Sequence, residues 1–356
     1  MNLTDSLNEI VEHAVASIVP GIAIQVVQDG DLIYENTSGH RTTFPSTQPV
    51  TVDTRFDLAS LTKIVTSTMI LILVSQSRLS LNTKIDTFFK PCLTSRMNER
   101  FSGISVKKLL THTSGFPAWH PFYCSNKSFL AQIDELIPMF SLDRKVCYSD
   151  LNFILLGKII EQITGMSLQD AFRDLIKIPV SLTSMEYGPV SEENVAATEF
   201  GNRIEMGMCN DRNKTFSDWR DIDEPIKGEV NDGNTHYFFQ GVSGHAGLFS
   251  TMKDVSKFAQ IYTDPTLAET VGLDCNLIEM ACREHVPGRG LGWEVSPIFM
   301  NRADHTGFTG TSICVDPTER VVVTLMTSRL HQEHPANLTS LREKVHEIVF
   351  RFLHNA

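Results

Sequence analysis

Ser60 and Lys63 form an S-x-x-K pattern where a polar stretch gives way to a strongly apolar segment. If a helix begins here, residues three apart share one helix face, so the hydroxyl and the amine can meet. A helix start also presents unsatisfied backbone N–H groups beside the hydroxyl. A nucleophilic serine needs a nearby base and donors for a developing oxyanion, and this pattern could supply both.

The same pattern has a simpler interpretation, because serine at a helix start is most often an N-cap. Two further copies occur, Ser105 with Lys108 and Ser250 with Lys253. For Ser105 and Lys108 we expect a cap and a surface charge. For Ser250 and Lys253 we expect a plain helix start. S-x-x-K is therefore weak alone, and other motifs must decide between catalysis and capping.

Tyr148 and Asp150 lie just before a helical pattern over residues 151–164. In an extended lead-in, residues two apart point the same way, so both side chains could face one cleft. Helix capping is the alternative role for Asp150 or Ser149. Tyr148 has no capping role, and its alternative is a packed aromatic ring with a bonded hydroxyl.

The elements that would position these residues are strands at the two ends of the chain and helices between them. Apolar periodicity predicts helices within 1–17 (capped by Thr4 or Asp5) and at 60–75, 105–110, 151–164, 168–176, 254–262 and 340–353, and strands at 21–27, 31–36, 290–295, 305–315 and 320–327. We predict an α/β (α+β) fold in which 1–57 and 286–356 form an antiparallel sheet flanked by terminal helices. Residues 58–285 would form a mostly helical lobe, with the active site between the two.

Composition limits the partners and the compartment. The 356 residues suffice for one large or two modest domains, and the net charge of −11 argues against nucleic acid or anionic membranes as partners. The acidic N-terminus does not resemble a signal peptide, and the most apolar stretch, 69–74, is too short to span a bilayer. Seven cysteines without C-x-x-C pairs favour a reducing compartment. We expect a soluble, cytoplasmic protein without a membrane partner.

Three motifs together resemble a known superfamily. Ser60-x-x-Lys63, Tyr148-Ser149-Asp150 and His305-Thr306-Gly307 resemble, in order and separation, the S-x-x-K, Y-x-N and K-T-G motifs of serine beta-lactamases and penicillin-binding proteins. The resemblance covers essentially the whole chain. LLTHTSG at 109–115, GHAGLFST at 244–251 and GLGW at 290–293 are typical of the class C-like branch, which includes esterases and D-amino-acid peptidases.

This resemblance implies roles for individual residues. Ser60 would be the acylated nucleophile, and Lys63 would take its proton or hold it in register, with a lowered pKa if buried. Tyr148 would act as a second general base and acid that protonates the leaving group. The backbone N–H groups of Ser60 and Phe308 would form the oxyanion hole. Whether Lys63 or Tyr148 is the acylation base stays open.

Two residues depart from the superfamily pattern. Asp150 replaces the usual Asn, and an ionised Asp only accepts hydrogen bonds, so it could hold Lys63 charged or accept from a substrate amide. His305 replaces the usual Lys, and with Thr306 and Gly307 it would contact the substrate. Because His is mostly neutral near pH 7, a beta-lactam or a free carboxylate is a weaker candidate substrate. An ester, or an amide with a neutral or differently charged acyl side, is favoured.

The predicted function is that of a serine hydrolase with an acyl-enzyme intermediate. The His-Thr-Gly, Y-S-D and G-H-A-G-L-F stretches and an acidic loop at 230–234 resemble N-acetylmuramyl-L-alanine amidase relatives, so a peptidoglycan-derived amide ranks beside a small ester as substrate. The alternatives are a carboxylesterase or transacylase, and a non-catalytic penicillin-binding-like sensor. No H-x-x-x-H or H-E-x-x-H spacing is visible, so we expect neither metal nor cofactor, and His112 and His245 are expected to be structural.

Overall fold

The computed structural model describes residues 2–136, 145–295 and 302–354. Its strands are β1 (Gly21–Gln28), β2 (Asp31–Thr42), β3 (Gln48–Pro49), β4 (Phe56–Asp57), β5 (Glu186–Tyr187), β6 (Leu248–Ser250), β7 (Glu294–Val295), β8 (Ala303–Thr306), β9 (Ser312–Asp316) and β10 (Val321–Thr327). Seven of them form one antiparallel sheet in the order β3-β2-β1-β10-β9-β8-β7, and β4, β6 and β5 form a smaller sheet. The first and last strands of the chain therefore pair, with Ile24 opposite Leu325.

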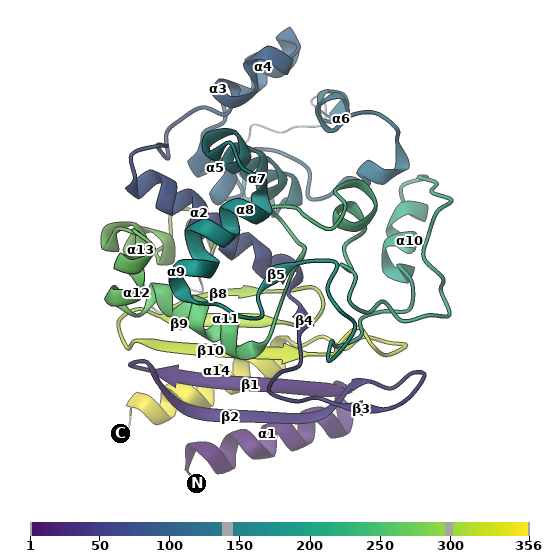
Figure 1. Ribbon diagram of the computed structural model, residues 1–356, viewed down its shortest axis with the longest axis vertical. Helices are drawn as coiled ribbons and strands as arrows, with labels where there is room; N and C mark the ends of the chain where they lie inside the picture. The colour runs from purple at the N-terminus through teal and green to yellow at the C-terminus, as the bar shows by residue number, and fades with distance from the viewer. Residues whose placement is uncertain (1, 137–144, 296–301, 355–356) are drawn as a thin grey trace.

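Helices cover both faces of the large sheet and fill the rest of the molecule (Figure 1). They are α1 (Leu3–Ser17), α2 (Thr62–Ser75), α3 (Asp86–Phe89), α4 (Ser95–Phe101), α5 (Val106–Leu110), α6 (Phe129–Leu136), α7 (Asp150–Thr164), α8 (Leu168–Phe172), α9 (Ile178–Val180), α10 (Arg203–Asn210), α11 (Met252–Ala259), α12 (Pro265–Thr270), α13 (Cys275–Cys282) and α14 (Thr339–His354). Short 3-10 turns are η1 (Ala59–Leu61), η2 (Lys90–Cys92), η3 (Phe122–Cys124) and η7 (Gln260–Tyr262), and π-helical turns are η5 (Arg173–Lys177) and η6 (Asn234–Phe238).

Side-chain alternation along β1 explains how the sheet is covered. Successive residues of a strand point to opposite faces. Ile22 and Ile24 pack in one apolar cluster with the terminal helices α1 and α14, whereas Ala23 and Val27 belong to the cluster on the other face. Helix α11 lies against β1 and β10 on that second face. Both faces of β1 are thus buried, which accounts for its nearly unbroken apolar sequence.

Helix α2 is buried over residues 62–73, as its all-round apolar sequence predicts. Its polar side chains are bonded to neighbouring segments: Thr66 donates to the Gly244 carbonyl at 2.8 Å, and Ser67 donates to the Leu291 carbonyl at 2.7 Å. Buried hydroxyls need such partners. These bonds tie the helix that follows Ser60 to two distant loops.

The fold class and most elements are confirmed, and several boundaries were wrong. The strand predicted at 31–36 continues to Thr42. The first helix is capped by Asn2 rather than by Thr4 or Asp5. The stretch 290–295 is a strand only at its end, because Gly292 has a φ of +90°. The predicted strand 305–315 is two strands, β8 and β9, because the turn between them closes with the Gly307 N–H donating to the Thr311 carbonyl at 2.8 Å.

The division into lobes at residues 57/58 and 285/286 stays a prediction. The larger sheet takes its strands from 21–49 and 294–327, and the helices α2 to α13 come from between them. Among the described residues, no helix is both long and apolar enough to cross a membrane.

Close packing between α7 and Gly244 generates a test of the fold. A Cβ at Gly244 would lie 2.1 Å from the Phe153 carbonyl oxygen and 3.0 Å from the Gly157 nitrogen, both of which belong to the backbone of α7. We expect Gly244→Ala to lower the free energy of unfolding by about 1–3 kcal/mol, measured by urea denaturation.

Gly207→Ala is the matched control, because this exposed glycine in α10 has open space around its missing Cβ. We expect it to gain about 0.5–1 kcal/mol from better helix propensity. Equal stability of the two variants would show that the Gly244 contact does not constrain α7.

Candidate functional site

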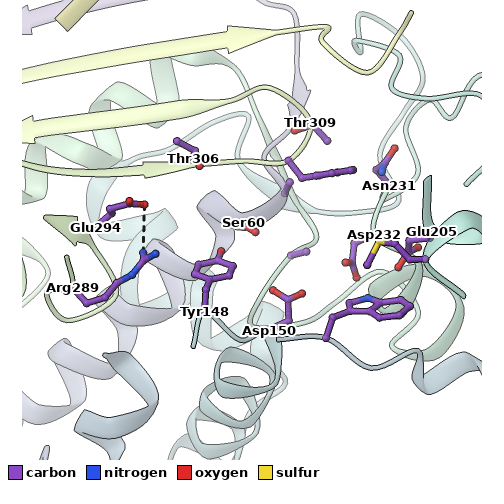
Figure 2. Close-up of a pocket in the computed structure, with 15 residues that line it drawn as sticks. Ser60, Tyr148, Asp150, Glu205, Asn231, Asp232, Arg289, Glu294, Thr306 and Thr309 are labelled. Carbon is purple, nitrogen blue, oxygen red and sulfur yellow. Dashed lines mark hydrogen bonds and ion pairs between the residues drawn. The ribbon is translucent and has the colours of Figure 1, made fainter. Parts of the chain in front are cut away.

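A cavity of about 410 Å³ brings together residues that lie far apart in the sequence. Ser60, Tyr148 and Asp150 line its middle, and Thr306 and Phe308 reach it from the end of β8 and the turn that follows. Figure 2 shows Arg289 and Glu294 at one end, with Glu205, Asn231 and Asp232 across Ser60 at the other.

Ser60 sits in a strained turn. The residue before it, Ala59, has a φ of +45°, a region that residues with a Cβ rarely adopt. The Asp57 carboxylate stabilises this turn by accepting from the Ala59 N–H at 2.8 Å. Thr309 and Thr311 donate to the carbonyls of Asp57 and Leu58, at 2.7 and 3.1 Å. These bonds hold η1 against the β8–β9 turn, and Ser60 lines the cavity from η1.

The three S-x-x-K copies differ in what their serines do. Ser105 caps α5 by accepting from the Lys108 backbone N–H at 3.3 Å, as predicted. The third copy is a helix start at which Thr251 is the N-cap of α11. Ser60 makes no capping bond, and its hydroxyl oxygen instead accepts from the Lys63 ammonium at 2.8 Å. Ser105 is therefore a cap, Ser250 lies one residue before a cap, and Ser60 binds the ammonium of its own motif.

Lys63 is a fully buried cation at the centre of the site. Its Nζ lies 2.8 Å from Ser60 Oγ, 2.8 Å from Asp150 Oδ1 and 3.2 Å from the His245 carbonyl oxygen. Burial is the largest single effect and lowers the pKa of Lys63, but the Asp150 carboxylate and Tyr148 together outweigh it and raise the pKa above its ordinary value. The prediction of a lowered pKa was wrong, because Asp150 holds the lysine charged.

Tyr148 packs between two cations. Its ring centre is 5.0 Å from Lys63 Nζ and 5.2 Å from the Arg289 guanidinium carbon. On a further side its ring lies 4.5 Å from that of His112, which is itself buried and accepts from the Ser149 N–H at 3.0 Å. His112 is thus structural, as expected. Tyr148 is fixed at the cavity wall beside the Ser60–Lys63 pair.

Phe308 lies in the β8–β9 turn, which contacts the segment around Ser60. A Cβ at Gly307 would lie 2.6 Å from the Leu58 carbonyl oxygen and 2.0 Å from Thr311 Oγ1, so only glycine fits this contact. Among the described residues, the Phe308 N–H has no hydrogen-bond partner, whereas its carbonyl accepts from Arg329 at 2.6 Å. A free N–H beside Ser60 fits an oxyanion-hole donor, which stays a prediction.

His305 and Gly307 do not line the cavity, whereas Thr306 does. His305 is buried, and its Nδ1 donates to the Thr306 carbonyl at 3.0 Å. Burial first, and then the charges of Lys63 and Arg289, lower the pKa of His305 to about 3, so the ring is neutral. The cation that does line this end of the cavity is Arg289, 3.5 Å from Glu294, and the sequence analysis missed it.

His245 is structural in the way expected of it, with Nε2 3.0 Å from Asp232 Oδ1 and Nδ1 2.8 Å from Ser243 Oγ. Among the described residues, Asp150, Asp232 and His245 form one cluster whose ligand atoms lie within 4.8 Å of one another. Lys63 Nζ already contacts Asp150 at 2.8 Å, so an ammonium takes the place beside this carboxylate that a metal ion would need.

Comparisons with known proteins find relatives along most of the chain. The model of the family described as Beta-lactamase matches residues 7–346. A putative D-alanyl-D-alanine carboxypeptidase of Escherichia coli is 28% identical over 88% of this chain and 79% of its own, and an N-acetylmuramyl-L-alanine amidase of Bacillus subtilis is 28% identical over 91% and 80%. An octameric penicillin-binding protein homologue from Pyrococcus abyssi has the same fold, with a TM-score of 0.74 and 22% identity over 99% of this chain and 78% of that one.

The Lys63–Asp150 pair generates a test that uses stability alone. In Asp150→Asn, burial persists while the compensating charge is gone, so the pKa of Lys63 should fall below its unfolded value. The folded variant then binds fewer protons than the unfolded chain, and its stability should rise with pH below about 10.4. We expect it to be less stable than the parent by about 3 kcal/mol near pH 7 and by much less near pH ~9.5.

Glu135→Gln provides the matched control, because it removes a carboxylate from the exposed Lys127–Glu135 ion pair. Such a pair contributes about 0–1 kcal/mol, and the difference from the parent should not change over this pH range. A pH-independent loss in Asp150→Asn would mean that Lys63 does not depend on Asp150 for its charge.

Proposed function

The chain belongs to the beta-lactamase family, and from this premise we propose that it is a serine hydrolase in which Ser60 is acylated by an amide or ester substrate. One observation carries the proposal: a buried ammonium, Lys63, lies 2.8 Å from both the Ser60 hydroxyl and the Asp150 carboxylate, and these two residues line a cavity. No structural role accounts for a serine that caps no helix and faces open space.

In acylation, Ser60 Oγ forms a bond to the substrate carbonyl carbon and loses its proton. A charged Lys63 has no lone pair to accept this proton, so we assign the transfer to the phenolate form of Tyr148, which becomes a phenol, and assign to Lys63 the orientation of Oγ. The carbonyl oxygen becomes an oxyanion beside the N–H groups of Ser60 and Phe308. The bond to the leaving group then breaks, and Tyr148 returns the proton to it.

In deacylation the same groups act in reverse. Water attacks the ester carbonyl of acyl-Ser60, the Tyr148 phenolate takes the proton from the water, and Ser60 Oγ leaves as it receives that proton from Tyr148. Asp150 touches neither reacting bond in this scheme. It acts through Lys63, as a positioning residue that keeps the lysine charged.

A peptidoglycan-derived amide is the substrate class that we propose first, because the amidase and the carboxypeptidase are similar along most of the chain. A small ester is the second candidate, for a carboxylesterase or transacylase. It is favoured because His305 is neutral and Arg289, the cation at this end of the cavity, is already paired with Glu294 at 3.5 Å. The proposal includes a small-molecule substrate and no nucleic-acid or membrane partner. It also includes a cytoplasmic site of action, which the seven free cysteines suit.

Covalent labelling tests the nucleophile. We expect a fluorophosphonate probe to add one label, located on Ser60 by peptide mass spectrometry, and Ser60→Ala to lose both the label and the hydrolysis of nitrophenyl acetate. Ser105→Ala, which removes the serine of a capping S-x-x-K copy, should keep both. A folded parent protein that takes no label and shows no acylation burst would identify a ligand-binding sensor instead.

Replacement of the phenol tests the proton transfer. Tyr148→Phe should lower kcat by about 10²–10⁴, as loss of a general acid–base group does. The control is Tyr34→Phe, which removes a hydroxyl that bonds Asn8 at 2.9 Å on the opposite side of the sheet, and its kcat should equal that of the parent. An unchanged kcat in Tyr148→Phe would remove this residue from the mechanism.

A further inference from the structure

The end of the cavity across Ser60 from Arg289 is lined by the acceptor oxygens of Glu205, Asn231 and Asp232 (Figure 2). Both carboxylate oxygens of Glu205 and the Oδ1 atom of Asn231 are buried without a hydrogen-bond partner among the described residues. The two residues are 7% and 3% exposed. The orientation of the Asn231 amide is fixed, because its Nδ2 donates to Glu199 at 3.0 Å, which leaves the oxygen as the free atom.

Glu205 has more negative than positive side chains around it. Burial, and then the negative charge of Asp232, raise the pKa of Glu205 well above its ordinary value, and the nearby Gly233 N–H and Trp119 side chain offset this rise only in part. Arg220 is the nearby cation, and it is bonded to the Val230 carbonyl at 2.7 Å and paired with Glu229 at 3.1 Å. Buried polar groups are nearly always satisfied, so unpaired ones that face a cavity indicate a ligand that supplies the donors.

We propose that Glu205, Asn231 and Asp232, here named the acidic subsite, bind a primary ammonium group carried by the acyl part of the substrate. An ammonium has three N–H donors and a positive charge, which match unpaired oxygens from a carboxylate and an amide. This inference rests on the proposed acyl-enzyme chemistry, and it names the substrate class for that chemistry.

The position of the acidic subsite assigns the ammonium to the acyl side. Tyr148 protonates the leaving group in the proposed mechanism, so the leaving group lies on the side of Ser60 where Tyr148 and Arg289 stand. The acidic subsite lies on the other side of Ser60 (Figure 2). Asp232 continues the line of carboxylates from Asp150, since its ligand atom is within 4.8 Å of the Asp150 oxygen. An acyl chain that leaves Ser60 in this direction therefore ends among carboxylates.

Matched pairs of substrates measure this preference. Each pair has the same length and shape and differs only in a terminal ammonium or methyl group: glycyl against propanoyl, β-alanyl against butanoyl, and γ-aminobutyryl against pentanoyl p-nitroanilides. The readout is the ratio of kcat/KM within a pair. For the best-fitting pair we expect the ratio to favour the ammonium about 10- to 100-fold, the range of a hydrogen bond to a charged group.

Glu205→Gln should bring this ratio down to nearly one, because the shape is kept and the charge is lost. Glu224→Gln is the control, since it removes the same charge from an exposed position and should keep the ratio of the parent. Equal ratios in Glu205→Gln and the parent, or a parent ratio near one for every chain length, would overturn the proposal.

Binding to Ser60→Ala separates this inference from the proposed function. Calorimetry with the same anilides needs no acylation, so a preference for the ammonium member of a pair would support the acidic subsite even if Ser60 proved inert. If nitrophenyl acetate acylates Ser60 but neither kinetics nor calorimetry favours the ammonium, the hydrolase stands and the acidic subsite falls. Calcium, magnesium or zinc that binds in a Glu205-dependent way and excludes the amine would identify a metal site and also overturn the proposal.

Discussion

A charged lysine without solvent contact is the constraint on which the rest of the site depends. Removing an ammonium from water costs several kcal/mol even after the protein relaxes, so its acceptors must be in place. Three separate segments supply the acceptors of Lys63: the Ser60 hydroxyl in η1, the Asp150 carboxylate at the start of α7, and the His245 carbonyl. The close contact of Gly157 with Gly244 holds two of these segments together. The packing of α7 is thereby coupled to the charge beside Ser60.

The cavity that results is electrically asymmetric. Arg289 and Glu294 balance each other at one end, while Glu205 and Asp232 at the other have fewer positive partners. Between them, Asp150 is neutralised by Lys63. The His305 ring is buried and neutral, so it adds no charge of its own. A ligand that bridges Ser60 would meet a paired cation on one side and an excess of carboxylates on the other.

The sequence predicted the features that are local. Motif spacing identified Ser60, Lys63, Tyr148 and Asp150, and apolar periodicity found α2 and α7, because helix faces and short spacings are set by neighbours in the chain. It could not decide whether S-x-x-K caps a helix or holds an ammonium, since the answer depends on whether a carboxylate arrives from 87 residues away. The sign of the Lys63 pKa shift failed for the same reason.

Other residues were out of reach of sequence analysis for different physical reasons. Glu205 lies in the short helix α10, whose sequence resembles that of any surface helix. Only the folded structure shows that its side chain lines the cavity. The split of 305–315 into two strands required knowledge of the contact between Gly307 and the Leu58 carbonyl. Arg289 carried one signal, its place directly before the GLGW stretch, but a lone arginine has no preferred meaning.

The protonation state of Lys63 in the folded parent protein tests the central claim most directly. Nitrogen NMR of lysine-labelled protein, with Lys63→Met to assign the signal, follows the Nζ atom through a pH titration. We expect the ammonium signal to persist without a titration step up to the ordinary lysine value of 10.5. A step near neutral pH would show that Lys63 is a neutral amine at working pH, and would contradict the role given to Asp150.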